Sequence, residues 1–169
     1  MRLIKNPWLG IEGYNCFGCC PSNPYGVKMQ FYEDGQDIVC FWKPQEQYQS
    51  WVNTLHGGVQ SVLLDEICGW VVSHHLRRSG VTAKMETRFR KPVVIEQDYV
   101  ELRARLRETK RNIAIVDGEI RSAVGEILVE CTCTYFTFDA AHAPKEVPFV
   151  ATEVGEEITR EEALASVNI

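Results

Sequence analysis

Hydrophobic and polar positions divide this sequence into one long apolar segment flanked by shorter alternating ones. Residues 59–76 carry apolar side chains on almost every face of a helix that turns by about 100° per residue. Two arginines follow in the last turn, where positive charge suits the negative end of the helix dipole, and Gly80 then stops the helix. The pattern predicts a helix that begins at residues 56–58 and is buried on most sides.

Four segments after this helix alternate apolar with polar residues, which is the period of strands that bury one face. They are residues 81–91, 99–108, 112–121 and 126–138. Short turns separate the last three segments, so the pattern predicts a meander of long antiparallel strands.

Two shorter strands are expected before the helix. Residues 27–32 alternate apolar with polar side chains, residues 38–42 are apolar, and the turn-rich residues 33–36 complete a hairpin. Two strands, one buried helix and four further strands favour an α+β fold in which a single antiparallel sheet wraps around one helix.

Length and composition fit one globular domain. The 169 residues are 45% hydrophobic and 24% charged, enough for a core without disulfide or metal staples. From residue 139 the chain is acidic and contains prolines, with a short helix expected at residues 159–165. We therefore divide the chain into a domain of residues 1–138, which includes a cysteine-bearing leader, and an acidic surface tail of residues 139–169.

Net charge and cysteine content indicate which partners and which cellular compartment to expect. The net charge of −5, without a basic tail, disfavours nucleic acid as a partner. The long apolar segment contains acids and histidines and is too polar to span a bilayer, and the basic N-terminus lacks the apolar segment of a secretory signal. Seven cysteines, an odd number, indicate a reducing compartment because several lie in apolar segments. We expect a cytoplasmic protein without membrane contact.

The predicted helix contains two acids, Asp65 and Glu66, and a carboxylate is costly to bury unless it is paired or used in chemistry. Gly57 and Gly58 open the helix with bare backbone N–H groups, which suit a developing negative charge on a substrate oxygen. The alternative is that the two glycines only allow close contact between helix and sheet.

Residues 55–66, Leu-His-Gly-Gly-Val-Gln-Ser-Val-Leu-Leu-Asp-Glu, resemble the His-Gly-Gly and aspartate signature of phenylacetate-pathway-type and 4-hydroxybenzoyl-CoA-type thioesterases, which have the hot-dog fold. Residues 15–19, Asn-Cys-Phe-Gly-Cys, and 23–27, Asn-Pro-Tyr-Gly-Val, are similar to the leader of many members. The likeness covers roughly residues 15–138. It implies an enzyme that hydrolyses an acyl-CoA or aryl-CoA and needs no cofactor.

The resemblance also implies roles for the site residues. Asp65 matches the acid that acts as general base on water or as nucleophile on the thioester carbon, which leaves Glu66 a structural role beside an arginine or a backbone N–H. His56 is expected to orient the turn and the thioester oxygen. Thr82 either orients the attacking water or is an ordinary strand residue.

Helix geometry adds an argument that is independent of the resemblance. Asp65 follows Gly57 by eight residues, so it lies about 12 Å further along a helix that rises 1.5 Å per residue. One chain cannot bring both groups to a single carbonyl. Two such helices packed antiparallel about a two-fold axis can, so we expect a homodimer, or a dimer of dimers, with shared active sites.

The loop before the helix offers candidates for substrate binding. Asn53 and Thr54 are expected to cap the helix or to bond the substrate carbonyl. Relatives often have an asparagine six residues before the histidine, where this chain has Ser50. Trp51 and Tyr48 either line an acyl or aryl pocket or anchor the loop.

Three basic residues near the end of the first long strand, Arg88, Arg90 and Lys91, are candidates for binding coenzyme A phosphates. The alternative is cross-strand pairing with acids on a solvated sheet face. The acids considered for this pairing are Glu86, Glu101 and Glu119.

Cys16, Cys19 and Cys20 invite a zinc interpretation, but a structural zinc ion needs four ligands and no second Cys or His pair follows at a suitable spacing. His74 and His75 are expected at the far end of the helix. We therefore expect free cysteines and no metal site.

Two other functions within the same fold are less consistent with the sequence. Hydratases and dehydratases carry their catalytic histidine in a Pro-Gly-His turn or an Asp-x-x-x-x-His stretch, and neither pattern occurs here. Non-catalytic acyl-CoA sensors of this fold carry a DNA-binding helical extension, and no basic helix-turn-helix pattern is present. The retained Asp65 favours hydrolysis.

Overall fold

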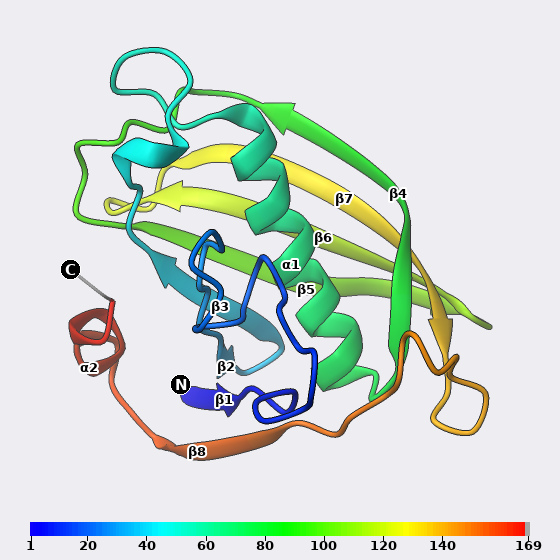
Figure 1. Cartoon of the computed structure of the whole chain (residues 1–169). Coiled ribbons are helices and arrows are strands. Elements are labelled where there is room, and N and C mark those ends of the chain that lie inside the picture. The colour runs from blue at the N-terminus through cyan, green and yellow to red at the C-terminus, as the bar shows by residue number, and fades with distance from the viewer. Residues whose placement is uncertain (168–169) are drawn as a thin grey trace.

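A computed structural model describes residues 1–167 and shows one long helix lying across a wide, curved antiparallel sheet (Figure 1). The helix, α1 (Gly57–His75), packs on one face of an eight-stranded sheet with the order β4-β7-β6-β5-β3-β2-β1-β8. The predicted α+β arrangement of one sheet around one helix is therefore confirmed. The strands are β1 (Arg2–Lys5), β2 (Tyr32–Asp34), β3 (Asp37–Trp42), β4 (Ser79–Phe89), β5 (Val100–Lys110), β6 (Ile113–Ser122), β7 (Ile127–Phe138) and β8 (Glu153–Glu157).

The helix is buried on most sides, as its sequence predicts. Its apolar residues, among them Leu63, Ile67 and Val71, are fully buried against the sheet. On the far side the N-terminal leader crosses in front of the helix (Figure 1), and Trp8 packs edge-on against Trp70. Burying large apolar side chains on opposite faces of one helix stabilises the fold and holds the helix in a fixed orientation. No helix within residues 1–167 is long and apolar enough to cross a membrane.

The predicted meander forms strands β4 to β7, with ends that shift by one or two residues. β4 ends at Phe89 because the N–H groups of Arg90 and Lys91 both turn to the carbonyl of Leu128. β4 pairs with β7 on one side and is an end strand of the sheet. An end strand of 11 residues presents a long row of backbone groups to any strand that approaches it.

The predicted first hairpin is only partly correct. β2 contains Tyr32 to Asp34, and residues 27–30 are not strand. Val27 and Met29 are buried as the alternation requires, but their N–H groups bond the carbonyls of Phe17 and Gly18 in the leader, each at 2.8 Å. The first part of the predicted strand therefore bonds the leader through these two N–H groups and is not part of the hairpin.

Two strands were not predicted. β1 at the N-terminus pairs with β2 and with β8, so the tail returns to the sheet that the N-terminus joins.

The predicted short helix is present as α2 (Arg160–Ala165), where Thr159 accepts from the Glu162 N–H and completes a capping box. Residues 168–169, the end of the predicted tail, lie outside the described residues.

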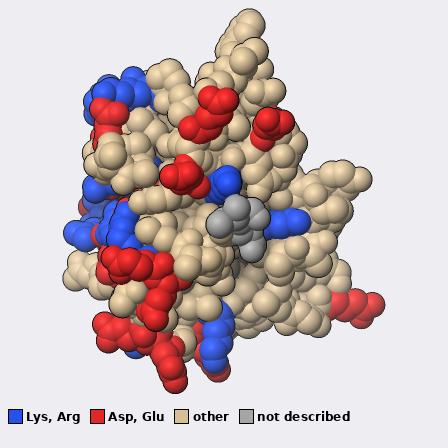
Figure 2. Space-filling model, turned by 90° about the vertical axis from the view of Figure 1, so that its left-hand side faces the viewer, with Lys and Arg blue, Asp and Glu red and all other residues tan. Residues whose placement is uncertain are grey.

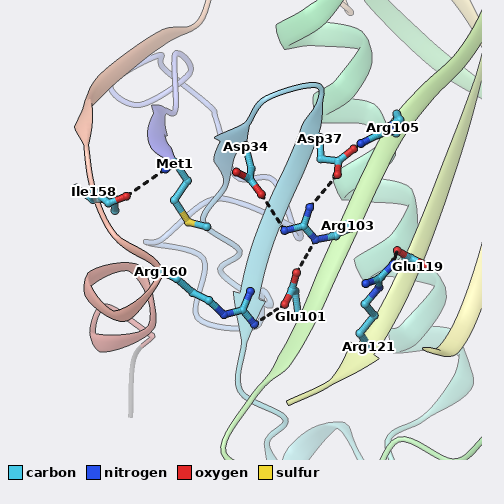
Figure 3. A network of polar contacts seen from close by, with 10 residues as sticks. All are labelled: Met1, Asp34, Asp37, Glu101, Arg103, Arg105, Glu119, Arg121, Ile158 and Arg160. Carbon is cyan, nitrogen blue, oxygen red and sulfur yellow. Dashed lines mark hydrogen bonds and ion pairs between the residues drawn. The ribbon is translucent and has the colours of Figure 1, made fainter. Parts of the chain in front are cut away.

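A network of ion pairs ties α2 to the sheet (Figure 3). Arg103 on β5 donates to Asp34 and Asp37, each at 2.8 Å, and to Glu101 at 2.6 Å. Glu101, whose side chain is 6% exposed, also accepts from Arg160 on α2 at 2.5 Å. Figure 2, viewed from the side of α2, shows charged side chains gathered along one side of the molecule.

Replacing Glu101 by Gln is expected to lower the free energy of unfolding by about 1–3 kcal/mol, because two arginines lose a nearly buried partner. Burial raises the pKa of Glu101, but hydrogen bonds from Arg160 and Arg103 outweigh it, so the folded-state pKa is lowered. A lowered carboxyl pKa contributes stability above the unfolded value and loses it as pH falls, below about pH 4. Urea unfolding at pH 7 and pH 3 measures this, and the difference between the two proteins should be smaller at pH 3 than at pH 7. Glu119→Gln, which removes only a pair with Arg121, is the control.

Candidate active site

Asp65 lies near the middle of α1 and is held by two hydroxyl groups from neighbouring strands. Its Oδ1 accepts from Thr82 Oγ1 on β4 at 2.8 Å and lies 3.0 Å from the Tyr135 hydroxyl on β7. That hydroxyl also lies 2.8 Å from the backbone carbonyl of Asp65. Within the described part of the chain Oδ2 accepts no hydrogen bond. The carboxylate is thus oriented through one oxygen, and the other is available for chemistry.

Tyr135 is a site residue that the sequence analysis did not find. It occupies the helix-facing side of β7 with Cys131 and Cys133, and a buried tyrosine on such a face needs a hydrogen-bond partner. Burial raises the pKa of its hydroxyl well above the ordinary value. Tyr135 therefore remains protonated and donates a hydrogen bond over the whole working range of pH.

The entry of α1 differs from the expectation in one respect. His56 is the N-cap, and its Nδ1 accepts from the N–H of Gly58 at 2.9 Å, so this amide already has a partner. Within residues 1–167 the N–H of Gly57 has none. The first glycine, rather than both, offers the free donor at the positive end of the helix.

Strand β4 runs past both ends of the candidate site. Thr82, near its start, bonds Asp65, whereas the Phe89 ring at its end lies 3.6 Å from where a Cβ on Gly57 would be. Phe89 is 52% exposed and Thr82 is exposed. Within one chain, Asp65 thus lies beside the start of β4, and the free amide of Gly57 lies beside its end.

Glu66 points away from Asp65, toward the leader. Its carboxylate accepts from Trp70 Nε1 at 3.2 Å and lies 3.5 Å from Cys16 Sγ. The sequence analysis expected an arginine or a backbone N–H as its partner, and this was wrong. The leader supplied the unexpected contact because it folds over the helix.

A cavity of about 490 Å³ adjoins Asp65. Thr82, Tyr135 and both helix acids line it, and the leader and α1 add the aromatic side chains of Trp8, Tyr14 and Trp70. A larger hollow of about 960 Å³ lies along β5, β6 and β7 among ion-paired arginines and does not include Asp65. The smaller cavity is the one that joins an apolar wall to the candidate chemistry, as small-molecule sites do.

The loop residues proposed for substrate binding have structural partners. Asn53 does not cap α1; its Oδ1 accepts from the N–H groups of Ile95 and Glu96, and its Nδ2 donates to the Glu96 carboxylate at 3.0 Å. Trp51 is 82% exposed in this loop, and Tyr48 donates to the carbonyl of Gly26 at 2.8 Å. Asn53 and Tyr48 therefore hold the loop, while Trp51 faces solvent.

Arg90 and Lys91, which follow β4, have acidic partners other than those considered from sequence. Arg90 pairs with Glu130 at 2.5 Å, and Lys91 pairs with Glu126. Arg88 lies opposite Glu130 in the register of β4 and β7 and lines the larger hollow. The three acids named earlier pair elsewhere: Glu86 with Lys84, Glu101 with Arg103 and Arg160, and Glu119 with Arg121.

Comparison with known proteins places this site in a family context. Residues 52–135, about half of the chain, match the thioesterase superfamily. The match includes Asp65, Thr82 and Tyr135. A comparison with curated proteins finds no match.

Solved structures share the fold at low sequence identity. A thioesterase superfamily protein, RHA08564, is 22% identical with a TM-score of 0.67, over 72% of this chain and 62% of that one, so this chain spans less than two thirds of that protein. A hypothetical thioesterase from Streptococcus pneumoniae with coenzyme A is 20% identical, with a TM-score of 0.61 over 66% and 89% of the chains. The smu.793 protein from Streptococcus mutans, bound to acetyl-CoA, is 15% identical, with a TM-score of 0.61 over 77% and 97%.

Proposed function

Because this chain belongs to the thioesterase superfamily and has the hot-dog fold, we propose that it hydrolyses acyl-CoA thioesters with Asp65 as the reactive acid. The observation that carries the proposal is the carboxylate of Asp65, oriented by Thr82 and Tyr135 beside a cavity. The Streptococcus pneumoniae thioesterase offers a parallel, since one of its aspartates and one of its threonines have each been replaced by alanine in crystal structures.

The free Oδ2 of Asp65 has two chemical uses. As general base it takes a proton from water, whose oxygen attacks the thioester carbon; the carbon–sulfur bond then breaks and coenzyme A leaves as the thiol. As nucleophile it attacks the same carbon, the carbon–sulfur bond breaks and coenzyme A leaves as the thiolate, which takes a proton from solvent; water then hydrolyses the resulting anhydride to the free acid and Asp65. Thr82 and Tyr135 donate to Oδ1 in both cases and keep the carboxylate aligned.

The oxyanion donor of this proposal is the Gly57 N–H of a second chain. Antiparallel pairing of two β4 strands about a two-fold axis brings the Thr82 end of one chain beside the Phe89 end of the other, and therefore Asp65 near the partner's helix entry. The long unpaired edge of β4 and the exposed Phe89 support such a homodimer.

The substrate class follows from the cavity. Its aromatic wall of Trp8, Tyr14 and Trp70 suits an apolar acyl or aryl group, which would pack on these rings. Arg88, Arg90 and Lys91 are the candidates for the coenzyme A phosphates, although Arg90 and Lys91 would first have to leave their glutamates. A cytoplasmic setting, where coenzyme A thioesters occur, is part of the proposal.

Purified protein is expected to release coenzyme A from at least one member of a panel of short, medium, long and aryl acyl-CoA substrates, with a kcat of about 1 s⁻¹ or more. Thiol release, followed with a chromogenic disulfide, measures the rate against buffer alone. Tight binding of an acyl-CoA without turnover across the whole panel would favour the sensor alternative instead.

A further inference from the structure

Two cysteines of the leader and one acid of α1 converge beside the cavity. The Sγ atoms of Cys16 and Cys19 and a carboxylate oxygen of Glu66 all lie within 4.8 Å of one another. The two oxygens of Glu66 are 3.5 and 3.6 Å from Cys16 Sγ. From the sequence alone this cysteine pair lacked further ligands, because Glu66 is 50 residues away along the chain.

The leader turn that carries the two cysteines is held in place by its backbone. The Cys20 N–H bonds the Cys16 carbonyl at 3.2 Å, and the Gly18 N–H points at Cys16 Sγ at 3.3 Å. A Cβ at Gly18 would lie 2.2 Å from the Glu66 carboxyl carbon, so only glycine lets the turn approach the acid this closely. The turn is thus preformed around the carboxylate, and a backbone N–H is available to stabilise a thiolate.

We propose that Cys16, Cys19 and Glu66 bind one Zn²⁺ ion, with the fourth position open to the cavity. Zn²⁺ takes thiolate ligands at about 2.3 Å and carboxylate ligands at about 2.0–2.2 Å, which places a sulfur and an oxygen about 3.5 Å apart in a tetrahedral site. The separation of Cys16 Sγ from Glu66 Oε1 matches this value. Thiolate donors select zinc over magnesium or calcium.

The groups around these three residues support the assignment. Trp70 Nε1 donates to Glu66 Oε1, and the Tyr14 hydroxyl lies 3.0 Å from Cys19 Sγ and accepts from Asn6 at 2.8 Å. Such outer contacts orient the ligands of metal sites. Both cysteines and Glu66 line the 490 Å³ cavity, so a water molecule or a ligand can reach the fourth position. The ion would fasten the leader to α1 next to Asp65.

Two other clusters of metal-ligating side chains are less suitable. Cys68, Cys131 and Cys133 have sulfurs 3.8 and 3.9 Å apart, but all three lie within the core, the cluster includes no carboxylate, and the larger hollow reaches only Cys131 of the three. Glu33 lies with His74 and His75 at the other end of α1, where it is already paired with Arg2, and the positive charge of that arginine opposes a bound cation.

The zinc content of the whole chain, purified under reducing conditions and measured by elemental analysis, tests the proposal. One zinc ion per chain is expected in the wild type, with its loss in Cys16→Ser and Cys19→Ser and binding at least about tenfold weaker in Glu66→Gln. Cys20→Ser is the matched control, because the Cys20 sulfur contacts Ser22 and the Tyr14 carbonyl rather than the cluster. This variant should keep its zinc.

A spectroscopic measurement covers the case in which a variant folds poorly. Co²⁺ added to chelator-treated wild-type protein should give the charge-transfer band of a cobalt thiolate, and Zn²⁺ should then remove it. Wild-type protein that contains no zinc and gives no such band in its reduced form would overturn the proposal, as would zinc retained by all three ligand variants. Neither readout uses a thioester, so the result is independent of the proposed hydrolysis.

Discussion

Replacement of Asp65 by Asn is expected to lower kcat for the best acyl-CoA substrate by about 10²–10⁴ while the fold survives. Asparagine keeps an oxygen that can accept from Thr82 and Tyr135, so the local structure should be retained. It cannot take a proton from water or attack the thioester carbon. Steady-state kinetics with the substrate from the acyl-CoA panel measures the change, and circular dichroism checks the fold.

Glu66→Gln is the matched control for this experiment, since it removes the neighbouring charge of the same helix. Glu66 points toward the leader, away from Thr82 and Tyr135, so its loss should weaken substrate binding through the leader and raise KM, while kcat stays within about tenfold of the wild type. Full activity in Asp65→Asn, together with loss of activity in Glu66→Gln, would show that the other carboxylate carries the reaction.

The parts of the fold that follow from local patterns could be predicted from the sequence. The helix and the strands after it can be recognised because each has a repeating pattern of apolar residues, typical of its element, over about ten residues or more. β1 and β8 have only four and five residues, and they pair with each other although they lie near opposite ends of the sequence. Strands so short are stabilised by their partners rather than by their own sequence, so no local pattern reveals them.

The residues of the candidate site also differ in how far the sequence alone could reveal them. Asp65 could be predicted because it stands out on an apolar helix and matches the signature of the resembled family. Thr82 could be named only as one of two alternatives, a residue that orients water or an ordinary strand residue. Tyr135 could not be predicted, since its contact with Asp65 depends on the register of β7 against the helix, 70 residues away. The leader shows the same limit, because its contact with Glu66 appears only when the turn at Gly18 packs on the helix.

Two inactive variants are expected to restore activity when their chains are combined. Asp65→Asn removes the acid, and Gly57→Pro removes the free amide at a cost of about 3 kcal/mol in the transition state. Gly57 is the first residue of α1, where proline is well accepted, and His56 has the extended backbone that proline requires before it, with φ −61° and ψ 132°. A Cβ at Gly57 makes only ordinary contact with Phe89. Both variants should therefore fold.

Refolding the two variants together in equal amounts gives about half heterodimers, each with one site that has both its acid and its amide. Activity should return to roughly a quarter of the wild-type value, because the remaining dimers and the second site of each heterodimer stay inactive. Differently tagged chains prove that heterodimers have formed, and a mixture that is never unfolded is the control. If proven heterodimers stay inactive, the acid and the amide act within one chain, and the two helices of a dimer do not share a site.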